Sequence, residues 1–181
     1  RVQRAGPGSA SFAPAAVAVP TYISAWLKAH YPAEFIAGIL THDPGMYPRR
    51  LIVADARNFG IPILPIDVNA SDRVYRVEDA GEPPVPGIRL ALSEVRGMSE
   101  VEMDSLLKAR SEGPFVSLED LWRRTDVSQP VLENLIHIGA FDALESRGRH
   151  ELMWRAMDLA TRTKPQIGTQ LGFTLEGSIE E

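Results

Sequence analysis

The sequence predicts a mainly α-helical protein that carries one small antiparallel β element. Two observations support this prediction. Apolar residues recur at intervals of three and four through most of the chain, in runs that begin or end at a capping residue, a proline or a glycine. Only two short strand-like runs, RVYRVED and GIRLALSEV, lie close enough together to pair as a hairpin.

The composition is that of a globular protein. The chain has 181 residues, of which 44% are hydrophobic and 24% charged, enough for one domain or two small ones. It has no cysteine, which excludes disulfides and thiolate metal sites and fits a cytoplasmic location. No apolar run reaches the roughly 18 residues of a membrane span. The net charge of −5 argues against a strongly basic nucleic-acid binder, although an acidic chain can still present a basic edge.

The first half of the chain is predicted to hold an arm and three helices. Residues 1–16 are rich in Ala, Gly, Pro and Ser, so we expect an irregular arm. A first helix is expected from Thr21, and Pro32 suits the first turn of a second. Pro48 opens a third helix, which Gly60 closes. Because the chain begins at Arg1 and not at Met, we expect it to be a piece of something longer.

The second half is predicted to hold the β element and four more helices. IPILPIDVN is interrupted by prolines, so we expect an extended segment at a sheet edge. Ser99 and Glu102 have the spacing of a capping box, and Ser117 begins a similar helix start. The four helices are expected near 99–110, 117–124, 128–138 and 147–163.

Two connections between these elements are candidate phosphate-binding hairpins. VRGMS lies between a strand and a helix, and TDVS lies between two helices. Helix N-termini leave backbone N–H groups unpaired and carry a partial positive charge, so such turns can bind DNA phosphates without contacting bases. The candidate turn residues are Arg96, Gly97, Met98 and Ser99, and the candidate supporting cations are Lys108, Arg110, Arg123 and Arg124. The alternatives are a packed helical corner and, for the last two arginines, a helix C-terminus stabilised by nearby cations.

No set of residues predicts catalysis or metal binding. Asp43, Asp55 and Asp67 fall in different kinds of segment and share no spacing, so paired metal-binding carboxylates are not expected. Trp26 and Tyr31 could stack on bases, but aromatic residues at helical spacing are more often part of a core, and we expect a core position for both.

A resemblance to a known family covers roughly residues 17–160. It rests on ordered blocks: YISAWLKAHYPAEFIAGIL, ARNFGIPILPIDVNAS, IRLALSEVRGMSEVEMDSLLKAR, GPFVSLEDLWRRT and VLENLIHIGAFDAL. Together they resemble bacterial C-family DNA polymerases, which comprise the DNA polymerase III alpha subunit and its error-prone, damage-induced paralogue. VPTYISAWLKAHYPAEF and LTHDPGMYP look closer to the error-prone paralogue.

The resemblance implies a division of the chain and a role for it. Residues 17–68 would be the C-terminal part of the polymerase fingers, and 69–144 a β-hairpin with a tandem helix-hairpin-helix domain. Residues 145–181 would be a helix and a mobile tail. This piece would hold duplex or primer–template DNA during DNA repair and translesion replication. Catalysis and its Mg²⁺ would belong to a palm domain absent here, so this chain alone should not polymerise, and no cofactor is expected in it.

Other origins remain open. The family's Lys- and His-containing block before the first helix would fall near Ser11 and Ala13, neither of which can neutralise a phosphate. The chain could therefore be a natural fragment, a truncated copy or a degenerate one. The alternative function is a stand-alone helix-hairpin-helix module that binds DNA or protein without enzymatic activity, and a plain helical packing domain is a third.

The tail suggests one partner. In the replicative relative, a short peptide that contains Gln and ends in an aromatic residue binds the sliding clamp. Gln170, Leu171 and Phe173 stand at a similar distance after GAFDAL, where a Gln amide could hydrogen-bond and the apolar side chains could fill a pocket. The resemblance also suggests translesion accessory proteins as partners, and a tail without a partner is the alternative.

Overall fold

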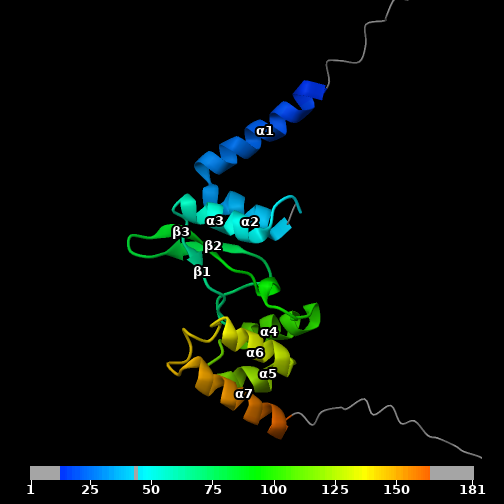
Figure 1. Ribbon diagram of the computed structural model, residues 1–181, viewed down its shortest axis with the longest axis vertical. Coiled ribbons are helices and arrows are strands. Elements are labelled where there is room, and N and C mark those ends of the chain that lie inside the picture. Colours follow the sequence, from blue (N-terminus) through cyan, green and yellow to red (C-terminus); the bar gives the residue numbers. More distant parts are fainter. Residues whose placement is uncertain (1–12, 43–44, 164–181) are drawn as a thin grey trace, which may run out of the picture.

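The computed structural model describes residues 13–42 and 45–163, which form two lobes stacked along the long axis of the molecule (Figure 1). The upper lobe holds three helices and a small sheet, and the helical lobe holds the rest. The elements are α1 (Ala13–His30), α2 (Pro32–His42), α3 (Arg49–Asn58), β1 (Ile63–Leu64), β2 (Arg76–Ala80), β3 (Val85–Arg89), the short 3-10 helix η1 (Leu92–Glu94), α4 (Glu100–Glu112), α5 (Leu118–Arg124), α6 (Gln129–His137) and α7 (Arg149–Thr163). The mainly α fold class predicted from the sequence is confirmed.

The sheet contains the predicted hairpin and one further strand. β2 and β3 pair antiparallel, as expected from RVYRVED and GIRLALSEV. β1 lies at the opposite edge and pairs with β3 in parallel, with Ile63 opposite Ile88, so the sheet is mixed and not purely antiparallel. The extra pairing uses the carbonyl just before the short strand and that of its last residue, because Ile88 N donates to Pro62 O at 2.8 Å and Leu90 N to Leu64 O at 3.1 Å.

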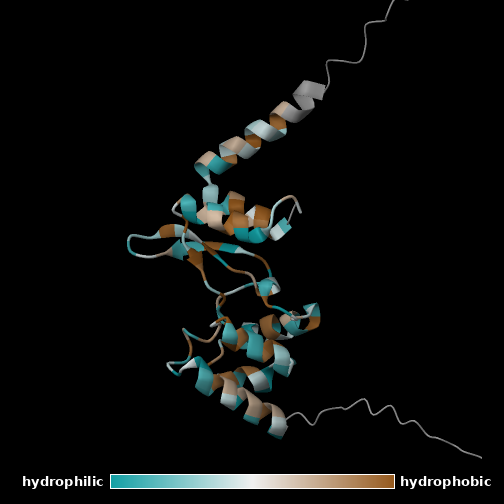
Figure 2. Cartoon of the chain, viewed as in Figure 1, coloured by the Kyte–Doolittle hydropathy of each residue, from teal (hydrophilic) through white to brown (hydrophobic). Residues whose placement is uncertain are grey.

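Each lobe has its own apolar core. In the upper lobe, α2 places Ile36 and Leu40 against the sheet, where Ile88 is fully buried. In the helical lobe, α4, α5 and α6 converge on side chains such as Leu106 and Phe141, both fully buried. Figure 2 shows hydrophobic (brown) segments alternating with hydrophilic ones along these helices. The helical core buries more than twice as many residues as the upper one.

The segment between β1 and β2 belongs to the helical core. Ile66 and Val68 pack there, and Val68 N donates to Ala140 O at 3.1 Å. Asn69 fixes the same segment, because its side-chain amide donates to Phe115 O at 2.9 Å and its carbonyl accepts from Phe115 N at 2.8 Å. The segment between β1 and β2 is therefore held by the helical lobe, although both strands belong to the sheet of the upper lobe.

The first helix differs from its prediction. α1 begins at Ala13 and contains Pro20, where the sequence suggested an arm up to residue 16 and a helix from Thr21. Alanine is the strongest helix former, and the Ala-rich run before Pro20 extends the helix backwards. Residues 1–12 of the predicted arm lie outside the described part of the chain.

Trp26 and Tyr31 are not core residues, so that prediction is wrong. Their exposed fractions are 43% and 51%, and they pack on each other with ring centroids 5.8 Å apart. α1 runs away from the rest of the lobe (Figure 1), so the helical spacing of its aromatic side chains is not matched by a second layer among the described residues. Across residues 13–42 and 45–163, none of the helices combines the length and apolarity that a membrane crossing needs.

Candidate nucleic-acid interface

The two predicted hairpins are present. The first turn, residues 96–99, connects η1 to α4, and Gly97 adopts a left-handed backbone with φ of +79°. A left-handed backbone favours glycine because a Cβ would be strained there. The second turn, residues 125–128, connects α5 to α6. Each turn ends in a serine that stands at the N-cap of the following helix.

The first hairpin has the predicted capping box. Ser99 Oγ accepts from Glu102 N at 3.3 Å, and the Glu102 carboxylate accepts from Ser99 N at 2.8 Å. The two reciprocal bonds satisfy donors at the start of α4, as a capping box does.

The same carboxylate also holds the second hairpin. Glu102 Oε1 accepts from Ser128 N at 2.9 Å and from Ser128 Oγ at 2.6 Å, while Oε2 serves Ser99. One carboxylate oxygen thus faces each hairpin. Partial burial opposes the charged form, but the hydrogen bonds from Ser128 and Ser99 outweigh it and lower the pKa of Glu102 from 4.5 to about 2.

Two further contacts join the hairpins. Asn134, on α6, donates from its side-chain amide to Arg96 O at 2.8 Å, so the second hairpin's helix supports the first turn. In the opposite direction, Ser105 on α4 accepts from Asp126 N in the second turn at 2.9 Å. The two hairpins are therefore held side by side by polar contacts in both directions.

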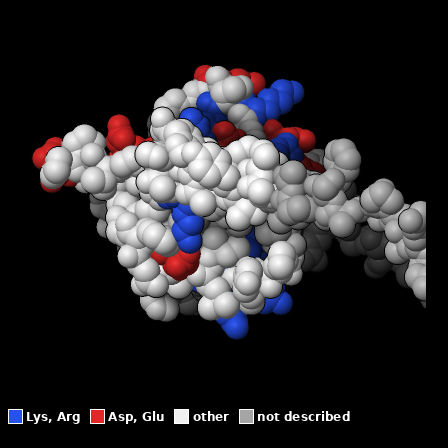
Figure 3. Space-filling model, turned by 90° about the horizontal axis from the view of Figure 1, so that it is seen from above, with Lys and Arg blue, Asp and Glu red and all other residues white. Residues whose placement is uncertain are grey.

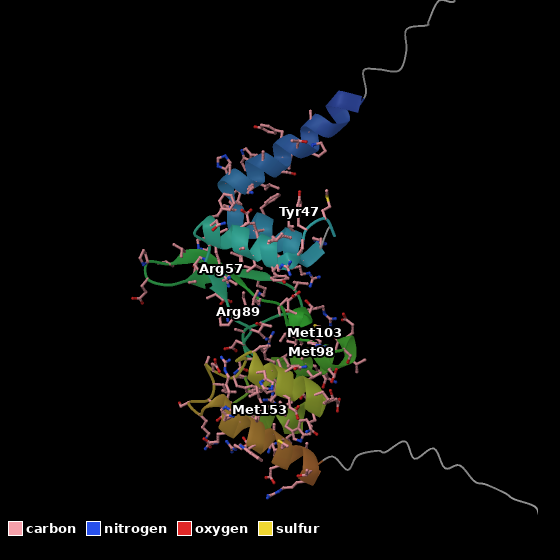
Figure 4. All side chains as sticks on the ribbon, in the orientation of Figure 1. Tyr47, Arg57, Arg89, Met98, Met103 and Met153 are labelled. Atoms are coloured by element: carbon pink, nitrogen blue, oxygen red, sulfur yellow. The ribbon has the colours of Figure 1, made fainter. Side chains whose placement is uncertain are left out.

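Some backbone donors at the first hairpin remain open. Within the described residues, the amides of Gly97, Glu100 and Val101 have no hydrogen-bond acceptor. The amide of Met98, by contrast, donates to Val95 O at 3.2 Å. The Met98 side chain packs on the helical core, and Figure 4 places it with Met103 at the start of α4. Open amides at the start of a 13-residue helix are suitable donors for an anionic oxygen.

The four predicted cations fall into two pairs. Lys108 is exposed and has no ion pair among the described residues, and the Arg123 side chain is 78% exposed with a single carboxylate partner, Asp120, at 3.0 Å. Arg110 and Arg124 instead donate to backbone carbonyls inside the protein. Arg110 Nη1 donates to Ser71 O at 2.5 Å.

Arg124 links several parts of the helical lobe. It donates to Ala109 O, to Gly113 O at 2.9 Å and to Asp120 Oδ2 at 3.0 Å, and it lies over the Phe115 ring at 4.9 Å. Its hydrogen bonds to Asp120, together with those from Val116 and Arg123, lower the pKa of that carboxyl against the opposing effect of burial. Arg124 thus stabilises the junction of α4 and α5, which leaves Lys108 and Arg123 as the accessible cations of the predicted set.

Acidic side chains near the first hairpin are neutralised in part. Arg73 makes ion pairs with both Glu100 and Asp104 on the first turns of α4. These pairs reduce the local negative charge that a phosphate would meet, although surface pairs of this kind contribute little stability.

A separate hollow lies on the upper lobe, and the sequence did not indicate it. It has a volume of about 380 Å³ and is lined mainly by apolar side chains of α2 and α3, with Tyr47 between them. Lys28 and Asp55 pair at its rim, 3.4 Å apart. Seen from the α1 end, the surface is largely uncharged (Figure 3). Its distance from the hairpins in the fold makes it a separate feature from the candidate interface.

Two groups of predicted residues are not part of this geometry. Gln170, Leu171 and Phe173 lie outside the described residues. The acids Asp55 and Asp67 belong to no metal-binding group, and within residues 13–42 and 45–163 no three His, Asp or Glu side chains are arranged to hold a metal ion.

Comparison with known proteins agrees with this arrangement. Residues 60–152 match the family described as "Helix-hairpin-helix motif". The chain is 36% identical to "Error-prone DNA polymerase" of Symbiobacterium thermophilum over 185 aligned positions, which cover 90% of this chain and 17% of that protein. It is 40% identical to the protein of the same name from Corynebacterium glutamicum, with 77% of this chain and 12% of that protein covered. For the Burkholderia mallei protein of that name the identity is 38%, with coverages of 81% and 14%.

The fold and the paired turns define a helix-hairpin-helix protein. The chain belongs to the helix-hairpin-helix family, and its relatives at 36–39% identity are bacterial error-prone DNA polymerases, to one part of which it corresponds. It spans between 12% and 17% of the length of the relatives named above.

The sequence did not indicate the contacts of Ser105 and Asn134 between the hairpins, nor the second contact of Glu102, with Ser128. The capping-box spacing identified Glu102, but its partner Ser128 lies 26 residues further along the chain. Contacts at such separations leave no local sequence signal. The serine before each hairpin helix was visible, and two N-cap serines in tandem hairpins are the one feature from which a shared acceptor could have been suspected.

Proposed function

We propose that this chain is the duplex-holding part of an error-prone DNA polymerase that acts in DNA repair and translesion replication. Its two hairpins would bind the phosphate backbone of primer–template DNA without reading its sequence. The observation that carries the proposal is the pair of hairpins held side by side, with open amides at the start of α4. Similarity to the error-prone polymerases supports it.

Lys108 and Arg123 are the cations we assign to DNA binding. Both are accessible, and neither is committed to backbone carbonyls in the way that Arg110 and Arg124 are. They would add charge attraction to the hydrogen bonds from the turn amides. We assign Arg110 and Arg124 the indirect task of holding the hairpin lobe together.

Catalysis would belong to another part of the polymerase. Two-metal nucleotidyl transfer needs grouped carboxylates, and within residues 13–42 and 45–163 no three His, Asp or Glu side chains are arranged to hold a metal ion. The palm domain and its Mg²⁺ would lie in the part of the polymerase that these alignments do not reach. A cytoplasmic location follows from the same proposal.

The test is binding of this chain to a primer–template duplex, measured by fluorescence anisotropy over a range of salt concentrations. We expect an affinity that does not depend on the DNA sequence. The logarithm of the affinity should fall linearly with the logarithm of the salt concentration, by about 0.9 units per tenfold rise in salt for each phosphate contact. Lys108→Glu with Arg123→Glu should weaken binding about ten-fold or more. Arg57→Glu combined with Arg50→Glu is the matched control, because it also reverses two exposed positive charges, both on α3 of the upper lobe (Figure 4), and it should have little effect.

Two results would contradict the proposal. One is the absence of duplex binding at about 50 mM salt, which would favour a helical packing domain. The other is an equal loss from the control with Arg50 and Arg57 replaced, which would indicate that only net charge matters and that the hairpins have no special part.

A stand-alone module without enzymatic activity is the second candidate, and the closed core of the helical lobe favours it as a unit that can fold by itself. The genomic sequence upstream of Arg1 separates the two candidates. Palm carboxylates in the same reading frame support the polymerase, and an in-frame start codon near Arg1 supports the module.

We propose the sliding clamp as the partner of Gln170, Leu171 and Phe173, and accessory translesion proteins as further partners of the polymerase. A pull-down with the clamp should lose its signal when Gln170 and Phe173 are both replaced by Ala. No binding by the unaltered chain would end that proposal.

A further inference from the structure

Glu102 stands at the meeting point of the two hairpins. Its Oε2 accepts from Ser99 N at 2.8 Å and from Ser99 Oγ at 2.7 Å, while its Oε1 accepts from Ser128 N at 2.9 Å and from Ser128 Oγ at 2.6 Å. Four donors from two turns, 29 positions apart in the chain at their serines, thus converge on one carboxylate.

Capping of α4 accounts for only half of this arrangement. A capping box needs the Ser99 contacts, and it would be complete without Ser128. Ser128 has the N-cap position of α6 but makes no side-chain cap to its own helix. Its hydroxyl is directed to Glu102 instead. The second hairpin therefore gives up its own cap and depends on the first hairpin for an acceptor.

The contacts of Asn134 and Ser105 strengthen this link from both hairpins. Asn134 holds the carbonyl of Arg96 in the first turn, and Ser105 holds the amide of Asp126 in the second. Both contacts join a side chain of one hairpin's helix to the backbone of the other hairpin's turn. They fix the distance between the turns, which the apolar core below them would otherwise set alone.

We infer that Glu102 is a positioning residue that sets the spacing of the two hairpins, so that both engage the phosphate backbone of one duplex together. This inference rests on the proposed function. When two binding groups are rigidly linked, the second contact forms at a high effective concentration once the first has formed. If the link is lost, the turns move independently and simultaneous engagement becomes rarer.

The test compares three variants of the full chain: Glu102→Ala, Glu102→Gln and Ser128→Ala. Each is measured for unfolding in urea, for affinity to a primer–template duplex and for the slope of log affinity against log salt. Glu102→Ala should bind about ten-fold more weakly and, because fewer phosphates are held at once, with a shallower slope. Glu102→Gln keeps one acceptor oxygen and should recover part of both quantities.

Ser117→Ala is the matched control. Ser117 is the N-cap of α5 in the same lobe. Its hydroxyl accepts from Asp120 N at 3.2 Å, within its own helix, and takes no part in the contacts that join the two hairpins. It should lower the resistance to urea while leaving the salt slope of DNA binding unchanged. A purely structural role for Glu102 would make the two alanine variants behave alike.

The outcomes separate this inference from the function on which it rests. No binding by the unaltered chain overturns the proposed function and this inference with it. Binding by the unaltered chain with an unchanged slope in Glu102→Ala overturns only the inference. If Glu102→Ala does not fold, Ser128→Ala decides, because it keeps the capping box of α4 and removes only one bond of the link. A shallower slope in Ser128→Ala supports the inference, and a slope equal to that of the unaltered chain overturns it.

Discussion

The helical lobe and the upper lobe are closed in different ways. In the helical lobe, fully buried side chains such as Leu121 and Phe141 form the core, and polar side chains such as Arg124 and Asn69 bind backbone carbonyls around it. In the upper lobe, the buried part of α2 meets a three-stranded sheet. The exposed aromatic side chains of this lobe are Tyr22, Trp26, Tyr31, Tyr47 and Phe59, whereas among the described aromatic residues of the helical lobe Trp154 is the exposed one.

The difference indicates which part of the chain is complete in itself. A lobe whose core is fully covered and whose backbone groups are bound by side chains can keep its geometry without a partner. A lobe with exposed aromatic side chains and an apolar hollow offers contact surface. The hairpins that we assign to DNA lie on the lobe whose geometry is fixed, as accurate placement of phosphate-binding groups requires.

The largest expected effect is on core leucines. Leu132 is fully buried in the helical lobe and Leu40 is 1% exposed in the upper lobe. Replacement of either by Ala should lower the free energy of unfolding by about 2–5 kcal/mol, because a cavity is left behind. Hydrogen exchange resolves which amides lose protection. We expect Leu132→Ala to affect mainly α4–α6 and Leu40→Ala mainly α1–α3. Equal loss in both lobes would show one cooperative unit and would remove the contrast between them.

A smaller effect is expected at two adjacent arginines. Arg124→Ala removes hydrogen bonds to the carbonyls of Ala109 and Gly113 and leaves these groups poorly satisfied, so it should cost about 1–3 kcal/mol of unfolding free energy. Arg123→Ala changes a side chain that is 78% exposed and should stay within about 0.5 kcal/mol. Urea titration of both variants measures the difference. DNA affinity should show the opposite order, provided that Arg124→Ala is folded.

The pH dependence should expose the link between the hairpins. The folded state lowers the pKa of Glu102 from 4.5 to about 2, so its contribution to stability is complete above about pH 4.5 and is lost as pH falls toward 2. Because the group is partly exposed, we expect the contribution to be only about 1 kcal/mol. Urea midpoints measured between pH 5.5 and 2.5 should fall less steeply for Glu102→Gln. Identical curves for the two proteins would show that Glu102 adds nothing to stability.

The smallest effect on stability is expected at the exposed aromatic surface of the upper lobe. Trp26→Ser replaces a side chain that is 43% exposed, so the free energy of unfolding should change by no more than about 1 kcal/mol. Self-association through the exposed aromatic surface of α1, measured by sedimentation, should decrease in this variant. A large loss of stability would instead show that α1 depends on Trp26, and the upper lobe would then be more self-contained than the contrast suggests.

Local signals in the sequence predicted most of the fold. The serine caps, the glycine turns and the β2–β3 hairpin each depend on residues close together in the chain, and the structure confirms them. The parallel pairing of β1 and the fourfold contacts of Glu102 depend on residues far apart, which periodicity and capping patterns cannot register.

For the candidate site, residue type alone could not separate the cations. Arg110, Arg123 and Arg124 look equivalent in the sequence, yet two of them bind carbonyls from distant segments and one faces water. The same limitation explains Trp26. Its helical spacing indicates an apolar face, but only the course of α1 in space decides whether that face meets a second layer.

The path of the chain between the lobes has a mechanical consequence. The chain leaves the upper lobe after β1, returns to it before β2 and leaves again after β3, because Ile66 and Val68 are part of the helical core (Figure 1). A hydrogen bond of 2.8 Å from Leu92 N to Asp72 O ties the last two crossings together. A single linker would let one lobe rotate freely relative to the other, whereas several neighbouring crossings resist that rotation. If the hairpins hold a duplex, rotation of that duplex would therefore turn the upper lobe as well, because the crossings between the lobes would not absorb it.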